Sequence, residues 1–153
     1  MRRILMRVMG AMNAWVYRRS NGRLMGRFPS GAPVCLLTTT GRRSGRPRTV
    51  PLLFLQDGAD CIVVASQGGA PQHPSWFLNL QTDPRAEIQS GARRVQVAAQ
   101  PVADEERALL WPRMVALYPA YEAYQQRTTR RIPLVRLTPT AAAAPRHQPD
   151  TAS

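Results

Sequence analysis

Short apolar runs separated by turn residues fill the middle of this 153-residue chain. Runs of about four to nine residues that are rich in Val, Leu and Ile and bounded by Gly, Pro, Asp or Ser are typical of β-strands. The first three runs follow one another closely enough to form a meander. The pattern therefore predicts strands at 33–38, 49–55, 61–66, 86–89, 93–101 and 132–137.

Helical segments are predicted between the later strands. Residues 73–80 have helical character and stop at Asp83-Pro84,. A second helix at 103–117 begins with acidic residues, which the helix dipole favours, and Pro112 should kink it,. Pro119 is expected to open a third helix. About six short strands with few helices indicate an α+β fold, a small antiparallel barrel or roll in one domain.

The loop between the first two strands concentrates positive charge. Residues 38–52 hold four arginines, Arg42, Arg43, Arg46 and Arg48, together with two glycines. Glycines let backbone N–H groups point outward, and guanidinium groups bind phosphate or carboxylate through two parallel hydrogen bonds. The loop therefore resembles an anion site. The alternative is an ordinary hairpin turn with solvated arginines, and the spacing alone does not choose between the two.

The charge distribution favours the anion site. The first 56 residues hold eleven arginines and no acid, whereas the remainder is nearly balanced, and the net charge is +12. Such a field suits a polyanionic ligand, an anionic membrane surface or nucleic acid. Nucleic acid is the weakest of these, because aromatic residues do not alternate with the arginines. The chain has no lysine, which excludes enzymes that need a P-loop, Schiff-base or pyridoxal-phosphate lysine,.

The N-terminal segment 1–29 is predicted to be a basic amphipathic helix with a linker. Residues 3–19 place apolar residues on one face, and the uncharged stretch 8–17 is too short to span a bilayer,. A signal peptide is disfavoured because Arg7 and Asn13 interrupt the apolar region. The helix either packs on the barrel or lies in the interface of an anionic membrane, and both interpretations stay open.

The cysteines and histidines give little support to a metal site. Cys35 and Cys61 each lie inside an apolar run, so we expect buried free thiols in a reducing cytoplasm,. His73 and His147 are far apart in sequence, and no cluster has metal-ligand spacing,. We therefore expect a cytoplasmic protein, which could be peripheral on the inner face of the cell membrane, with no metal.

Three segments together are similar to one known family. They are the arginine loop with the strand that ends it at 50–54, the run 65–80 (ASQGGAPQHPSWFLNL), and YPAYEAYQ at 118–125 followed by Arg131-Ile132-Pro133. In order and spacing they resemble the deazaflavin-dependent nitroreductases and quinone reductases. This resemblance covers residues 30–138, leaves 139–153 as a tail predicted to be disordered, and implies a split β-barrel that uses coenzyme F420, an 8-hydroxy-5-deazaflavin.

The resemblance implies a coenzyme site in each segment. The arginine loop would hold the phosphodiester and glutamate tail, the strand 50–54 would lie along the deazaflavin edge, and the glycine loop 65–69 would approach the ring closely. Trp76 and Asn79 would face the ring and phosphate, although a tryptophan in such a helix is also typical core. The implied coenzyme-binding residues are Arg42, Arg43, Ser44, Arg46, Arg48, Thr49, Val50, Pro51, Leu52, Leu53, Val64, Ala65, Ser66, Gln67, Gly68, Ser75, Trp76, Phe77, Leu78, Asn79 and Tyr121.

The candidate catalytic residues are hydroxyl donors. Tyr118, Tyr121 and Tyr124 recur every third residue, so their rings can line the mouth of a pocket, although they could instead form a packing stripe,. In the family that the chain resembles, this region contacts the acceptor. A neutral phenol or the Ser66 hydroxyl can donate a hydrogen bond to an acceptor oxygen as it becomes negative.

The expected activity is hydride transfer from the reduced deazaflavin coenzyme to a lipophilic acceptor such as menaquinone, with nitroaromatics or enones as further substrates. One alternative is an FMN-dependent split-barrel oxidoreductase, because an arginine-rich loop also suits the FMN phosphate. Another is a noncatalytic lipid or flavin binder. Leu53 stands where the family often has an aromatic residue, which leaves the substrate range open.

Overall fold

The computed structural model describes residues 33–140. The predicted N-terminal helix and the residues from 141 onward lie outside this part. Within this part, the fold consists of one sheet of seven strands with three α-helices. The elements are β1 (Val34–Thr40), β2 (Pro47–Leu53), β3 (Leu55–Asp57), β4 (Asp60–Val64), the 3-10 turn η1 (Gln67–Gly69), α2 (Ser75–Thr82), β5 (Arg85–Ser90), β6 (Arg93–Pro101), α3 (Asp104–Leu117), α4 (Ala120–Gln126) and β7 (Leu134–Pro139).

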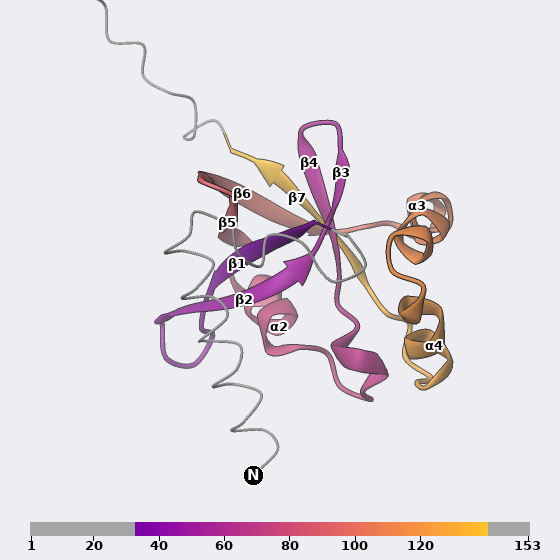
Figure 1. Cartoon of the computed structure of the whole chain (residues 1–153). Coiled ribbons are helices and arrows are strands. Elements are labelled where there is room, and N and C mark those ends of the chain that lie inside the picture. The colour runs from indigo at the N-terminus through magenta and orange to yellow at the C-terminus, as the bar shows by residue number, and fades with distance from the viewer. Residues whose placement is uncertain (1–32, 141–153) are drawn as a thin grey trace, which may run out of the picture.

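The sheet curls because one chain segment serves as both of its edges. The strand order is β2-β1-β5-β6-β7-β4-β3, and every described pair is antiparallel. β2 and β3 stand at opposite ends of this order, yet only Phe54 separates them in sequence. The run that begins at Pro47 therefore pairs first with β1 and then with β4, which rolls the sheet into a split barrel (Figure 1).

Side-chain alternation continues through this change of partner. Leu52 and Phe54 pack with the apolar core on one side of the sheet, whereas Leu53 and Leu55 pack with the core on the other. The predicted strand 49–55 is thus a single alternating run, and it counts as two strands because its hydrogen-bond partner changes. This accounts for seven strands where about six were expected.

Two apolar cores flank the sheet because several strands are buried on both faces. In β4, Cys61 and Val63 face the core that includes α2, while Ile62 and Val64 face the core that includes α3 and α4. Cys35 and Cys61 are buried free thiols, as expected.

The predicted elements agree with the structure in type and order. Strand 93–101 has the predicted bounds, and the α+β split barrel is confirmed. The predicted tail 139–153 is wrong for its first two residues, because Pro139 pairs with Val97 at the end of β7 and Thr140 donates its N–H to the carbonyl of Gln96 at 3.0 Å. No described helix is long and apolar enough to cross a membrane.

Candidate active site

The loop between β1 and β2 is a compact, ordered turn. Gly41 donates its N–H to the carbonyl of Arg46 at 2.8 Å, and Gly45, at φ 69°, donates to the carbonyl of Gly41 at 2.8 Å. The Ser44 hydroxyl accepts the N–H of Arg46 at 3.2 Å. A Cβ on Gly41 would lie 2.7 Å from that hydroxyl oxygen and 3.2 Å from the Arg46 carbonyl oxygen, so a larger residue here would displace the Ser44 hydroxyl from the turn.

Asn79 fixes the loop to α2. Its Oδ1 accepts the backbone N–H of Arg42 at 3.1 Å and the Arg42 guanidinium Nη1 at 3.0 Å, and its Nδ2 donates to the Thr39 hydroxyl at 3.1 Å. Asn79 and Thr39 are both buried. A buried amide with all of these groups paired holds the loop far more rigidly than a solvated turn would be held. Asn79 thus positions an arginine, and Thr39 is a contributor that the sequence did not single out.

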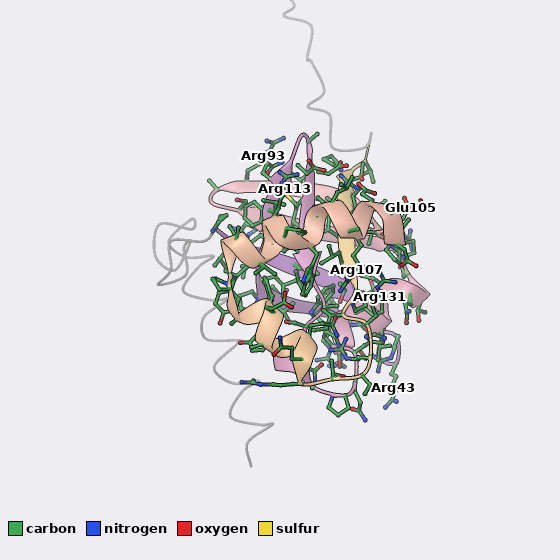
Figure 2. All side chains as sticks on the ribbon, turned by 90° about the vertical axis from the view of Figure 1, so that its right-hand side faces the viewer. Arg43, Arg93, Glu105, Arg107, Arg113 and Arg131 are labelled. Carbon is green, nitrogen blue, oxygen red and sulfur yellow. The ribbon has the colours of Figure 1, made fainter. Side chains whose placement is uncertain are left out.

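The other loop arginines point into solvent. Arg43, Arg46 and Arg48 are exposed, and in the described part of the chain none of the four loop arginines forms an ion pair with a carboxylate. Figure 2 shows Arg43 at the end of the molecule opposite Arg93 and Arg113. Guanidinium groups clustered without acidic partners are available to an anionic ligand.

The strand after the loop is half-buried at an edge of the sheet. Thr49 faces Thr38 across the β1–β2 pair, with their hydroxyl oxygens 2.8 Å apart. Val50 and Leu52 are partly buried against the α2 core, Pro51 is half-buried, and Leu53 is buried on the other face. The predicted position of this strand along a ring edge remains a prediction.

A tight turn follows β4. Gln67, Gly68 and Gly69 have φ values of 45°, 62° and 79°, and Gln67 is the one described residue other than glycine with a positive φ. Such backbone strain persists where surrounding contacts enforce it. The turn is closed by the N–H of Gly69 on the carbonyl of Ser66 at 2.9 Å, and Ser66 itself is buried.

Gly69 docks this turn onto α4. A Cβ at Gly69 would lie 2.5 Å from the carbonyl oxygen of Tyr124, whereas a Cβ at Gly68 would meet nothing within 4 Å. Gly69 therefore packs against α4, and Gly68 borders open space that a planar group can approach,.

Arg130 also holds this turn, through hydrogen bonds to its backbone carbonyls. Its Nε donates to the carbonyl of Ala70 at 2.8 Å, its Nη2 to the carbonyl of Ser66 at 2.8 Å, and its Nη1 to the carbonyl of Ala65 at 3.2 Å. Nη1 also lies 3.1 Å from Nδ1 of His73. No sequence signal points to this role, because Arg130 is one of many arginines and its partners lie about sixty residues away.

The three tyrosines come together. Ring centroids of Tyr118 lie 5.0 Å from Tyr121 and 6.2 Å from Tyr124, and the hydroxyl oxygens of Tyr118 and Tyr124 are 3.3 Å apart. Burial raises the pKa of Tyr121, and the hydrogen bond with Tyr124 raises the pKa of Tyr118. Tyr121 is buried while the other two are half-buried, so the cluster combines packing with neutral phenol donors,.

The predicted residues of α2 are divided between core and surface. Trp76 and Phe77 are about 5 to 6% exposed and belong to the apolar core, which is the alternative that the sequence left open for Trp76,. Leu78 is partly buried. Ser75 is exposed at the first turn, and its carbonyl accepts Arg42 Nη1 at 3.5 Å. The residues from 33 to 140 contain no group of three metal-ligating side chains.

Comparison with known proteins agrees with this geometry. The family model described as F420H(2)-dependent quinone reductase matches residues 9–139. The chain belongs to this family. An F420H(2)-dependent quinone reductase of Mycobacterium tuberculosis is 43% identical over 127 residues, which cover 80% of this chain and 85% of the relative. The family expected from the three sequence segments is therefore confirmed.

Solved structures confirm the split-barrel fold of this reductase family. One described as an F420-H2 dependent reductase has a TM-score of 0.64 and 39% identity, and covers 69% of this chain and 93% of that one. HutZ, a heme storage protein from Vibrio cholerae, has a TM-score of 0.55 at 19% identity, covers 70% of this chain and 81% of that one, and shares the fold alone.

Proposed function

We propose that this protein is an oxidoreductase that uses reduced coenzyme F420 to reduce a lipophilic, quinone-like acceptor such as menaquinone. The observation that carries this proposal is the match to the quinone reductase family over 9–139, which includes both the arginine loop and the tyrosine cluster. Nitroaromatics and enones are expected as further acceptors, because a donor aimed at a developing oxyanion serves them equally.

The described residues fit such a coenzyme. Its anionic tail suits Arg42, Arg43, Arg46 and Arg48, which have no acidic partner among residues 33–140 and stand on a loop fixed by Asn79,. Gly68 leaves open space where a flat ring would approach the backbone. When bound, the reduced coenzyme supplies the hydride, so the chain need not hold a redox group of its own.

The chain's own task is to orient the acceptor and stabilise charge on its oxygen. The hydrogen bond with Tyr124 raises the pKa of Tyr118, so the half-buried Tyr118 hydroxyl remains protonated at neutral pH and can donate a hydrogen bond. Ser66, on the turn that docks against α4, is the second candidate donor. Donors held in place before the reaction are more effective than solvent, because they need no reorganisation.

A binding experiment separates this proposal from the FMN alternative. Titration of the purified protein with coenzyme F420 and with FMN, followed by calorimetry, should give micromolar or tighter binding of the former and far weaker binding of the latter. Equal or tighter FMN binding would overturn the assignment. FMN carries one phosphate, whereas the four loop arginines suit the longer anionic tail of the deazaflavin coenzyme,.

We also propose that residues 1–27 bring the protein to an anionic membrane surface, where a lipophilic quinone is dissolved. Support comes from the sequence alone: the segment holds seven arginines, no acid and an apolar stripe,. Deletion of residues 1–27 should abolish co-sedimentation with anionic vesicles and leave reduction of a soluble quinone intact. A truncated protein that unfolds would show instead that the segment packs on the barrel.

A further inference from the structure

Arg130 is a half-buried arginine whose partners are backbone carbonyls rather than an acid. It uses four of its five N–H groups on Ala65, Ser66, Ala70 and His73, and within residues 33–140 it forms no ion pair. Burial lowers its pKa, and the cost of burying the charge is offset by these acceptors,. A side chain held in this way has a specific structural task.

The three carbonyls belong to the turn that carries Ser66. Because the guanidinium group is planar and rigid, it fixes the carbonyls of Ala65, Ser66 and Ala70 relative to one another. These residues bracket the strained positive-φ positions 67–69, which need enforcement from outside,. Arg130 supplies part of this enforcement, and the packing of Gly69 against Tyr124 supplies another part.

Arg130 is also tied to the tyrosine helix through its own backbone. Its carbonyl accepts the Gln125 side-chain amide at 2.9 Å, and Gln125 lies in α4 next to Tyr124. The side-chain oxygen Oε1 of Gln125 in turn accepts the N–H of Ile132 at 2.9 Å and the Arg107 guanidinium at 3.2 Å. The segment 130–132 is thus linked through Gln125 to α3 and α4, and through the Arg130 side chain to the Ser66 turn.

We propose that Arg130 is a positioning residue that locks the 65–70 turn and α4 into one unit, and that quinone turnover depends on this lock. The second part rests on the function proposed above. The lock fixes the turn that carries Ser66 against α4, the helix that carries Tyr121 and Tyr124. Arg130 therefore controls kcat, while the coenzyme tail stays bound to the separate loop 41–48.

The test combines a structural and a kinetic measurement. In Arg130→Lys, which keeps the charge but loses the planar fork, hydrogen exchange at the amides of Gly69 and Ala70 should speed up by about tenfold or more without coenzyme, while the central strands stay protected. The kcat with menadione should fall by about tenfold or more, with the coenzyme Kd changed by less than about twofold. Millimolar guanidinium should partly restore turnover in Arg130→Ala, and sodium chloride should not.

Arg131→Lys is the matched control, because Arg131 is exposed (Figure 2) and, within residues 33–140, its one ion pair is with the exposed Asp104 at 2.9 Å. It should behave as wild type. His73→Ala, which removes one of the four contacts, should give an intermediate loss and serves if Arg130→Lys fails to fold. Unchanged exchange in the variants would overturn the lock, and faster exchange with unchanged kcat would overturn its role in turnover. If the wild-type protein shows no reductase activity but Arg130→Lys still exchanges its amides faster, the proposed function is refuted and the structural role of Arg130 is retained.

Discussion

Individual side chains of the site are tuned to stay neutral. Tyr121 has a raised pKa because it is buried, and Tyr118 because it shares a hydrogen bond with Tyr124. Burial and the positive charge of Arg130 lower the pKa of His73. Neutral phenols can donate hydrogen bonds without presenting a negative charge to the anion that forms on an acceptor. The imidazole of His73 lies against Arg130, where a neutral ring avoids charge repulsion,.

Removal of one hydroxyl should affect turnover rather than coenzyme binding. Tyr118→Phe and Ser66→Ala are each expected to lower kcat with menadione, and loss of a preorganised donor is worth about 2 to 4 kcal/mol. The coenzyme Kd should change little, because the arginine loop is untouched. Steady-state kinetics with a parallel binding titration measures both quantities. Wild-type kcat in both variants would show that solvent supplies the proton and that these residues only pack.

The loop arginines should set the salt dependence of coenzyme binding. Arg43→Gln is expected to weaken coenzyme binding and to flatten the loss of affinity between about 0.05 and 0.5 M salt, because exposed charge pairs are screened,. Arg93→Gln removes the same charge from the opposite end of the molecule and is the matched control (Figure 2). Equal salt dependence in the two variants would mean that only the overall charge of the protein matters.

At the scale of elements, the turn η1 connects the barrel to the tyrosine helix. It sits on α4 only because Gly69 has no Cβ. β4 delivers the turn, α2 follows it, and the arginine loop is fixed on α2 through Asn79. The segments that the sequence singled out separately are therefore connected in space (Figure 1).

Two neighbouring glycines provide a paired test of this contact. Gly68→Ala introduces only backbone strain at positive φ, about 1 to 2 kcal/mol, because its Cβ would meet nothing within 4 Å,. Gly69→Ala adds a clash with the Tyr124 carbonyl at 2.5 Å, so it should lower the free energy of unfolding further and reduce kcat more. Denaturant unfolding and menadione kinetics compare the two. Equal effects would show that docking of η1 on α4 is unimportant.

The contact between His73 and Arg130 predicts a loss of stability in mild acid. The pKa of His73 lies below its ordinary value of 6.5 in the folded state, so the unfolded chain binds more protons between those two values,. Stability is therefore fully present above pH 6.5 and should fall as the pH drops through the folded pKa. The melting temperature of wild type should decline over this range more than that of His73→Asn, with His147→Gln as the control. Parallel curves for wild type and His73→Asn would contradict this.

Most of the strands and helices could be predicted from the sequence, but the pairing of the strands in the sheet could not. Alternation and the Ser90-Gly91 turn located β5 and β6, because both signals are local. The change of partner at Phe54 leaves no local trace, since alternation runs through it. The arginine loop was visible as a cluster, whereas Arg130 was not, because its partners come from another part of the chain.

In the molecule as a whole, a network of ion pairs around Arg136 lies apart from the candidate site and connects β7 with the β3–β4 hairpin and α3. Arg136 on β7 bonds to Asp57 at 3.0 Å, to Asp60 at 2.9 Å and to Glu106, which joins the β3–β4 hairpin to α3. Pairing with Arg136 lowers the pKa of Asp57. This network lies apart from the arginine loop and stabilises the closure of the sheet rather than the reaction.

The most direct test of the account is a turnover assay with the purified full chain. Reduced coenzyme F420 mixed anaerobically with menadione should be oxidised in proportion to protein, at a rate that saturates with both substrates. Reduced FMN or NADPH offered in its place should support little or no turnover, because the arginine loop is expected to bind the anionic tail of the deazaflavin coenzyme. Preferential turnover with reduced FMN, or no oxidation of reduced coenzyme F420 above the rate without protein, would contradict the account.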